Sequence, residues 1–304
     1  MVRWRKALDR LEGAYSEQTL KGYASDFAEF EKWCAKEGLS ALPAEPATLV
    51  RHIDEAALRL KPSSITRRLC GIRKIYRVLH LTDPTVDEDV VLAMRRARRK
   101  KPGRPDQALG LTADLRDRLV AECSDDLIGL RDEIMVRVGF DSLCRRAELV
   151  ALRVEDLTIN NRGNLSILVR RAKTDQEGSG RTVHLSRVTS ERVRVWLEAS
   201  DIDTGPLLRP IYQGKTVSRF LSPMTVARVL KKLAARAAVG IDTVPRVSGH
   251  SLRVGAAQQL TIDGYGILPI MRAGGWRSMN TVARYIENVD MDVWEERVDE
   301  GRRQ

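Results

Sequence analysis

The sequence predicts a mainly α-helical protein with a small antiparallel β-sheet, organised in two domains. Aromatic residues make up only 5% of the 304 residues, so we expect a core of Leu, Val, Ile and Ala, which fits helices better than a β-sandwich. Apolar residues recur at the three- and four-residue spacing of an α-helix over several long stretches. A basic stretch broken by proline and glycine interrupts this pattern near residue 100, as a linker between domains does.

The domain boundary is predicted from the run RRARRKKPGRP at residues 95–105. This composition suits an exposed linker better than a packed element; a solvated helix end is the alternative, and the tail PGRP favours the linker. We predict a helical DNA-binding domain over residues 1–101, a basic linker over 102–106 and a second domain over 107–304. A linker this basic is itself a candidate to lie along DNA, through Arg98, Arg99 and Lys100.

The first domain is predicted to begin with two helices. Ser16 can cap a helix that ends near Gly38, and Pro46 can open a second helix that runs to about Leu60. The first of these helices carries an apolar stripe at alternating three- and four-residue spacing, formed by Leu20, Tyr23, Phe27, Phe30 and Cys34.

A third helix is predicted over residues 64–79, after Pro62 and Ser63, and its two faces differ in character. One face is apolar and consists of Ile65, Leu69, Ile72, Tyr76 and Leu79. The opposite face combines basic, hydroxyl and small side chains, namely Thr66, Arg67, Cys70, Gly71, Lys74 and Arg77. Such a face suits a helix that lies in a DNA major groove, whereas the alternative is a merely solvated charged face.

The second domain is predicted to be mixed. Helices are expected over residues 114–124, 127–142 and 145–152, then from about 191 onward, including one opened by Ser222 and Pro223 that runs through Arg236, and a final one near 293–297. Turns at residues 160–164 and 175–180 alternate with strand-like segments at 165–169 and 182–185. These strands predict the small antiparallel sheet.

Charge is the most informative bulk property. The net charge is +11 and the sequence pI is near 9.7, in the range of proteins that bind nucleic acid through phosphate contacts. A generally basic soluble protein is the alternative. Binding to an anionic membrane surface is less favoured, because no long segment has a clean apolar face opposite clustered lysines.

The cysteines and the start of the chain indicate a protein that acts inside the cell. Cys34, Cys70, Cys123 and Cys144 are scattered with no CxxC and no His at ligand spacing, which is typical of reduced thiols and not of a disulfide framework or a zinc site. No apolar run follows the basic first residues, so no signal peptide is expected, and no stretch has the length of a membrane span. We expect a cytoplasmic protein associated with the nucleoid.

Breaking a DNA strand without metal or ATP requires a nucleophile, cations around the phosphate and an acid for the leaving oxygen. Arg145 and Glu148 lie three residues apart on one predicted helix face, so the carboxylate could orient the guanidinium group toward a phosphate. Lys173 lies at the mouth of the turn between the predicted strands. Taken alone, such a pair is usually a surface ion pair, and such a lysine usually has no role.

Three further candidates lie near the carboxyl end. His250 and Arg253 lie one helical turn apart among small residues, which let a backbone approach closely. Trp276 follows two glycines and could donate its indole N–H to a phosphate oxygen, although a core tryptophan is the usual alternative. Tyr285 by itself would be an ordinary core or surface tyrosine.

The order and spacing of these weak signals are specific in combination. The segments are LCRRAELVALRVEDL (143–157), RRAKT (170–174), GHSLRVGAA (249–257), IMRAGGW (270–276) and RYI (284–286), with LPAEP (42–46) and AMRRARRK (93–100) in the first half. They resemble the tyrosine recombinase (phage integrase) family, and within it the Cre-type recombinases. The resemblance spans nearly the whole chain.

The resemblance implies a role for each candidate. Tyr285 would attack the phosphate and form a 3′-phosphotyrosyl link, while Arg145 and Arg253 would clamp the non-bridging oxygens. Lys173 would protonate the departing 5′ oxygen. The other implied roles are proton movement or phosphate binding for His250, a hydrogen bond to the phosphate for Trp276, where many relatives carry a histidine, and an acidic supporting position for Glu148.

The resemblance also implies an architecture and partners. The two domains would form a C-shaped clamp on double-stranded DNA that carries inverted-repeat sites, and four subunits would assemble on two such sites from a free monomer or weak dimer. The tail over residues 288–303 would dock on a neighbouring subunit, and its alternative is to fold back on its own domain. On the helix over residues 222–236 we expect Met224, Thr225 and Arg228 to contact DNA.

No cofactor is expected. Exchange of a phosphodiester for a phosphotyrosine keeps the bond energy, and the sequence has no Walker motif and no clear carboxylate cluster for two metal ions. Two alternatives to recombination remain at this point. One is strand relaxation of the type IB topoisomerase kind, and the other is an architectural or regulatory DNA-binding protein that never cuts.

Overall fold

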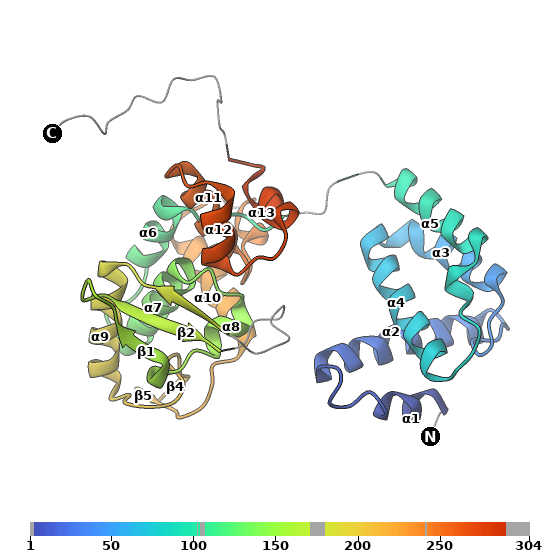
Figure 1. Ribbon diagram of the computed structural model, residues 1–304, viewed down its shortest axis with the longest axis horizontal. Helices are drawn as coiled ribbons and strands as arrows, with labels where there is room; N and C mark the ends of the chain where they lie inside the picture. Colours follow the sequence, from blue (N-terminus) through green and yellow to red (C-terminus); the bar gives the residue numbers. More distant parts are fainter. Residues whose placement is uncertain (1–2, 102, 104–106, 171–179, 241, 290–304) are drawn as a thin grey trace, which may run out of the picture. The chain divides into compact units, whose positions relative to one another are not determined.

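The chain forms two compact units, Met1–Asp106 and Gln107–Gln304, each with its own hydrophobic core (Figure 1). The computed structural model describes residues 3–101, 103, 107–170, 180–240 and 242–289. Helices dominate both units and the second carries a small antiparallel sheet, which confirms the predicted fold class. None of the helices in these ranges is both long and apolar enough to cross a membrane.

The first unit is a helical bundle. Its helices are α1 (Arg3–Asp9), α2 (Glu17–Lys36), α3 (Pro46–Arg59), α4 (Pro62–Val78) and α5 (Glu88–Lys100), with a 3₁₀ turn, η1 (Pro84–Val86), before the last. The three helices predicted for this unit are confirmed as α2, α3 and α4. Ser16 caps α2 as expected, because its Oγ accepts the backbone N–H of Thr19 at 3.2 Å.

Helix α1 was not predicted from the sequence. Its seven residues are too few to show a helical period, yet Trp4 is fully buried. The Trp4 ring packs edge-on against Phe27 at 5.1 Å, and its Nε1 donates to Glu31 Oε1 at 3.0 Å. One large side chain thus anchors this short helix on α2.

The reading of residues 95–100 as part of a linker is wrong. These residues form the last turns of α5, where Met94 and Ala97 are buried while Arg98, Arg99 and Lys100 are exposed. Three cations in the last helical turn interact favourably with the negative end of the helix dipole, so the basic run favours the helix instead of breaking it. Residues 102 and 104–106 lie outside the described residues.

The second unit contains most of the helices. They are α6 (Ala113–Ala121), α7 (Leu127–Asp141), α8 (Arg146–Val150), α9 (Arg187–Ser200), α10 (Pro223–Arg236), α11 (Ser251–Ile262), α12 (Ile267–Gly274) and α13 (Met279–Ile286), with 3₁₀ turns η2 (Val154–Asp156) and η3 (Val244–Arg246). The helices predicted at 114–124, 127–142, 145–152 and 223–236 are confirmed with small shifts at their ends. The helix predicted near residues 293–297 falls outside the described residues.

The predicted pair of strands is present in a three-stranded sheet. Strands β1 (Leu157–Ile159), β2 (Leu165–Val169) and β3 (Arg181–His184) are antiparallel in the order β1-β2-β3. Ile167 lies opposite Val183, and both side chains enter the core. The sequence missed β1, since two of its three residues are exposed, and also the small hairpin of β4 (Ile211–Tyr212) and β5 (Lys215–Thr216).

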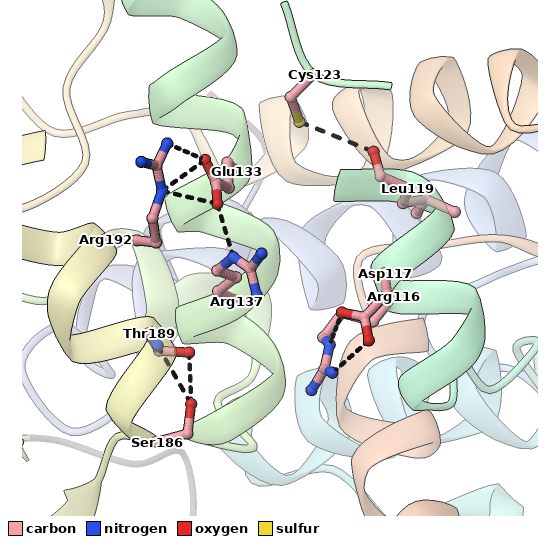
Figure 2. Close-up of polar contacts among 9 residues, drawn as sticks. All are labelled: Arg116, Asp117, Leu119, Cys123, Glu133, Arg137, Ser186, Thr189 and Arg192. Carbon is pink, nitrogen blue, oxygen red and sulfur yellow. Dashed lines mark hydrogen bonds and ion pairs between the residues drawn. The ribbon is translucent and has the colours of Figure 1, made fainter. Parts of the chain in front are cut away.

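Polar contacts join α7 to α9 beside this sheet. Arg192 of α9 donates to Glu133 of α7 at 2.6 Å, and Arg137 donates to the same carboxylate at 2.7 Å (Figure 2). Ser186 caps α9 through the backbone N–H of Thr189 (Figure 2). The middle turns of α7, the helix that leads into the loop of the candidate site, are therefore held against α9.

The four cysteines form no disulfide bond with one another. Cys34 and Cys144 are buried, and burial raises the pKa of the Cys34 thiol to about 11. Burial also raises the pKa of the Cys123 and Cys144 thiols, so none of these three thiols is poised as a nucleophile.

Candidate active site

The loop between α7 and α8 carries the first candidate arginine. Leu143 adopts a positive φ of 48°, and the chain turns there so that α8 starts directly after Arg145. The buried carboxylate of Glu148 accepts both the backbone N–H of Arg145 at 3.0 Å and its Nη1 at 2.7 Å. This is the contact that the R-x-x-E spacing predicts, and it fixes the guanidinium group at the start of the helix.

Helix α11 carries the second candidate arginine in its first turn. Arg253 is completely buried, and its Nη1 donates to the carbonyl oxygen of Leu143 in the loop that precedes Arg145. Its guanidinium carbon lies 4.0 Å from the centre of the Trp276 ring, a cation–π contact. Gly274 makes room for that ring, because a Cβ at this position would lie 1.9 Å from it.

Four N–H donors of this site are buried and, among the described residues, have no hydrogen-bond partner. They are Nε and Nη2 of Arg253, Nε1 of Trp276 and Nε of Arg181, at the start of β3. A buried donor without a partner costs about 1–3 kcal/mol, and more when it is charged. Donors left open at that cost are typical of a site that receives an anionic ligand.

Tyr285, on α13, lies against this group of donors. Its hydroxyl oxygen is 2.6 Å from Nε2 of His250, and its ring meets the Trp276 ring edge-on at 5.5 Å. The phenol is half-buried, so it is neither sealed in the core nor free in solvent. The structure thus gathers Tyr285, His250, Arg253 and Trp276 into one cluster, and Arg253 connects this cluster to the Arg145 loop.

Burial and neighbouring cations shift two pKa values in the cluster. Burial, reinforced by the charges of Arg253 and Arg145, lowers the pKa of His250 to about 4. Burial and the charge of Arg145 lower the pKa of Arg253 to about 10, which still leaves it charged at neutral pH. The histidine is therefore neutral while the arginine stays cationic, the protonation states that suit a base beside an anion site.

We expect cleavage by this site to tolerate acid further than an ordinary histidine allows. The neutral ring is the form that can accept the phenolic proton, so activity should decline as pH falls through about 4 and not through the ordinary value of 6.5. The measurement is kcat/KM for strand cleavage against pH, because this ratio reports the free enzyme. Circular dichroism over the same range separates acid unfolding from titration, and a decline centred near 6.5 in folded protein would contradict the assignment.

Arg181 is a half-buried residue of this site that the sequence gave no reason to single out. From the start of β3 its guanidinium group donates to the carbonyl oxygens of Ala273 at 2.6 Å and Ser142 at 2.9 Å. It also lies 4.0 Å from the Glu148 carboxylate. Arg181 thereby joins the loop before Arg145 to the end of α12 before Trp276, and no sequence signal separates it from a surface arginine.

Lys173 falls among residues 171–179, outside the described residues, so its expected position near the cluster stays a prediction. Within the described residues, no group of three or more His, Cys, Asp or Glu side chains could hold a metal ion.

The face of α4 that was predicted to contact DNA is only partly as expected. Thr66, Arg67, Cys70 and Arg77 are exposed. Gly71, however, is buried against α2, where a Cβ would lie 2.8 Å from Cβ of Asp26. The small residue therefore serves close packing of two helices and not an approach to a duplex, which corrects the predicted face.

Two cations on this face of α4 have partners within the protein. Arg67 forms an ion pair with the buried carboxylate of Asp26. Lys74 donates to the hydroxyl group of Tyr15 at 2.7 Å and lies 4.5 Å from the centre of its ring. Tyr15 and Asp26 thus hold these two side chains in defined positions, a role that the sequence did not indicate.

On α10, Met224 and Arg228 are exposed, but Thr225 is buried. The Thr225 hydroxyl accepts a hydrogen bond from Arg228 at 3.3 Å. Thr225 therefore steadies Arg228 and does not itself face solvent, which corrects its predicted place on the exposed face.

Comparisons with known proteins agree with this arrangement. The phage integrase family matches residues 110–291, and the phage integrase N-terminal SAM-like domain matches residues 3–81. An integrase/recombinase xerD homolog of Selenomonas ruminantium is 33% identical over 299 residues, which cover 93% of this chain and 85% of that protein. The recombinase cre of Escherichia phage P1 is 28% identical over 297 residues, 92% of this chain and 87% of that protein.

Among solved structures, a lambda integrase dimer bound to a core site matches with a TM-score of 0.65 at 15% identity, over 95% of this chain and 96% of that one. XerH site-specific recombinase bound to a palindromic difH substrate matches with the same TM-score of 0.65, also at 15% identity, over 89% of this chain and 76% of that one. At this level of identity the two likenesses show a shared fold.

The phenol of Tyr285 shares a hydrogen bond with His250 beside buried arginine donors, an arrangement that agrees with the family match. The class that the fold and this site define is the tyrosine recombinases. The chain belongs to the phage integrase family, and within it the match to cre supports the Cre-type assignment.

Proposed function

We propose that this recombinase cleaves and rejoins DNA through Tyr285. The observation that carries the proposal is the 2.6 Å contact of the Tyr285 hydroxyl with the neutral His250, next to the open donors of Arg253. The phenol oxygen forms a bond to the scissile phosphorus, the bond from phosphorus to the 5′ oxygen breaks, and a 3′-phosphotyrosyl link remains. Attack by a 5′-hydroxyl group on this link reverses the step.

The other residues of the site either bind the phosphate oxygens or transfer protons. Arg253 and Arg145 bind the non-bridging oxygens as charge builds on them, and Trp276 Nε1 adds a neutral donor. His250 takes the phenolic proton. Lys173 gives a proton to the departing 5′ oxygen, the role that the family resemblance implies. One ester is exchanged for another, so the reaction needs no ATP.

Trapping the covalent intermediate tests the proposal. A substrate with a nick near the scissile phosphate loses its 5′-hydroxyl fragment after cleavage and cannot be rejoined. We expect a denaturant-resistant protein–DNA adduct whose modified peptide contains Tyr285. A protein that binds this substrate but yields no adduct would instead be the non-cutting DNA-binding protein.

A second assay, on intact DNA that can be rejoined, separates recombination from strand relaxation. Joint products between two site-bearing duplexes are expected, whereas relaxation of supercoiled plasmid regardless of sequence, without joint products, would favour the topoisomerase-like alternative. The relatives named above are recombinases, which favours the first outcome.

We propose that the two units close on the duplex as a C-shaped clamp, with the exposed face of α4 toward the DNA. Arg67 and Lys74 are pre-positioned there by Asp26 and Tyr15, which lowers the entropy cost of placing them on phosphates. Met224 and Arg228 on α10, together with Arg98, Arg99 and Lys100 at the end of α5, supply further contacts from exposed positions.

Replacing Arg67 and Lys74 together by alanine should weaken DNA binding and flatten its dependence on salt. If each contacts one phosphate, the slope of log K against log salt concentration should fall by about 2. Fluorescence anisotropy titrations between about 50 and 200 mM salt measure it. Lys36→Ala, at the exposed end of α2, is the matched control. An unchanged slope in the double variant would place this face away from DNA.

We further propose that four subunits assemble on two inverted-repeat sites and that the carboxyl-terminal tail docks on a neighbouring subunit. The exposed apolar side chains of Ile262 and Leu268, on α11 and α12, support a subunit contact on this part of the second unit. Analytical ultracentrifugation with DNA of defined site number measures the stoichiometry, and a chain that stays monomeric on paired sites would contradict this proposal.

A further inference from the structure

The second unit begins with a short extended segment, residues 107–111, that crosses helix α11; we name it the strap. The backbone N–H groups of Leu109 and Leu111 donate to the carbonyl oxygens of Arg246 and Ser251, at 3.1 and 3.0 Å. One bond reaches the first residue of α11, the helix that carries Arg253, and the other reaches the turn η3 before it, so the strap is fixed at the start of that helix.

Two glycines allow this close crossing. A Cβ on Gly255 would lie 2.0 Å from the carbonyl oxygen of Leu111, so only glycine fits where the strap passes over α11. A Cβ on Gly110 would lie 1.8 Å from Oε1 of Gln258. The strap therefore packs directly on the buried Gln258 side chain at Gly110 and holds it in one position.

Side-chain amides from the strap and from α11 meet at the end of the nucleophile helix. Nε2 of Gln258 donates to the carbonyl oxygen of Tyr285 at 3.1 Å. Nε2 of Gln107, the first residue of the strap, donates to the carbonyl oxygen of Arg284 at 3.0 Å, while its Oε1 accepts from Asn288 at 2.7 Å. Two consecutive carbonyls of α13 are thus bound by two glutamines.

These carbonyls belong to the last turn of a helix, which has no intrahelical N–H to bind them. Helix α13 has eight residues and is too short to be stable by its own backbone hydrogen bonds. Its orientation must come from contacts with the rest of the unit, and the contact on the carbonyl of Tyr285 acts on the residue that carries the phenol.

We propose that Gln107 and Gln258 are positioning residues that set the reach of Tyr285 toward the scissile phosphate, an inference that rests on the proposed role of Tyr285. The two amides hold the end of α13 at a fixed depth and rotation, so that the phenol stays at hydrogen-bond distance from His250. Since Gln107 directly follows residues 102–106, the same contact connects the segment between the two units to the nucleophile helix.

Substitutions that remove the side-chain N–H donor of each glutamine without changing its size test the inference. In Gln258→Glu and Gln107→Glu a carboxylate replaces the amide, so an oxygen faces the carbonyl and the N–H donor is lost at unchanged size. We expect the rate of adduct formation at saturating protein to fall about fivefold to tenfold for each and by more for the pair, because reacting groups displaced by about 1 Å can lose about 100-fold. DNA affinity should stay at the wild-type value.

The residue after Gln258 in the chain provides a matched control. Gln259 lies on the same helix, and its amide binds Ala113 and Asp263 without contact to α13. Gln259→Glu should therefore cleave at the wild-type rate. Amide hydrogen exchange within α13 should increase in the Gln258 and Gln107 variants alone, a readout that general loss of stability does not reproduce. If Gln258→Glu unfolds, the neutral Gln258→Met variant decides instead.

Each outcome has one meaning. Wild-type cleavage rates in folded Gln107→Glu and Gln258→Glu proteins overturn the positioning role and leave the nucleophile assignment intact. If DNA in the wild-type adduct is found on a residue other than Tyr285, the proposed function itself is wrong and the inference falls with it.

Discussion

A Tyr285→Phe variant is expected to bind target DNA with wild-type affinity and to form no covalent adduct. The substitution removes one oxygen, the atom that would bond to phosphorus, and keeps the ring against Trp276. The fold loses one hydrogen bond to His250, a cost of about 1 kcal/mol in stability. Cleavage should fall at least about 10,000-fold, the scale on which loss of a nucleophile acts. Adduct formation on the nicked substrate and an anisotropy titration measure the two effects.

Tyr265→Phe is the control for this result. Tyr265 is an exposed tyrosine of the same unit, with just over half of its surface accessible, so its variant should cleave normally. A Tyr285→Phe protein that still becomes joined to DNA would show that another group attacks the phosphate. Loss of DNA binding in that variant would show that the phenol serves binding, and the catalytic interpretation would then lack support.

Local signals in the sequence predicted most elements of the fold. Ser16, Pro46, Pro62 and Pro223 each mark the start of a helix through capping or through the geometry of the first turn. These effects act within a few residues and need no tertiary contact. Helix α1 depends on one tryptophan packed on a distant phenylalanine, and such an element leaves no local trace.

The prediction that one face of α4 is apolar and the other contacts DNA was wrong at Gly71 for a related reason. Helical periodicity identifies an apolar stripe, but α4 also packs closely on α2 through a small residue on its other side. A glycine that permits contact between helices and a glycine that permits contact with DNA look alike in sequence. Thr225 was misplaced similarly, since a hydroxyl group that accepts from Arg228 can lie buried.

For the site, the sequence predicted the residues that the structure gathers there better than the residues that support them. The order of Arg145, His250, Arg253, Trp276 and Tyr285 identified them together, because the chemistry fixes these residue types. Arg181 and the two glutamines act through hydrogen bonds to backbone carbonyls, which any residue supplies. Gln107 and Arg284 are 177 positions apart, so only the folded chain brings that donor and that carbonyl together.

The buried positive charge of Arg253 is the main electrostatic feature of the site. This charge is buried away from water, and only one nitrogen of Arg253, Nη1, has a hydrogen-bond partner among the described residues. The guanidinium group of Arg145 also lies close enough to affect it. Such an arrangement is unfavourable without an anion and becomes favourable when a phosphate arrives. The folded protein therefore holds its donors in place before DNA binds, and little reorganisation remains for the transition state.

Arg253→Lys should therefore cleave about 1000-fold more slowly than wild type, a loss of about 4 kcal/mol in transition-state stabilisation. Lysine keeps the positive charge but not the planar fork that can bind two oxygens at once, and its ammonium cannot both reach the Leu143 carbonyl and contact the phosphate in the same way. Single-turnover cleavage at saturating protein measures the loss. Thermal unfolding of the same sample shows how much of it reflects the fold.

The comparison with Arg246→Lys decides between geometry and charge. Arg246 is exposed on the turn before α11, so this variant makes the same chemical change on the same part of the chain and should leave cleavage unchanged. If Arg253→Lys folds and also cleaves at the wild-type rate, a positive charge alone is sufficient at this position, and the open Nε and Nη2 donors are not what binds the phosphate. If both variants slow cleavage equally, the effect arises from general electrostatics of the basic surface. Only a loss confined to Arg253 assigns transition-state binding to the buried fork over Trp276.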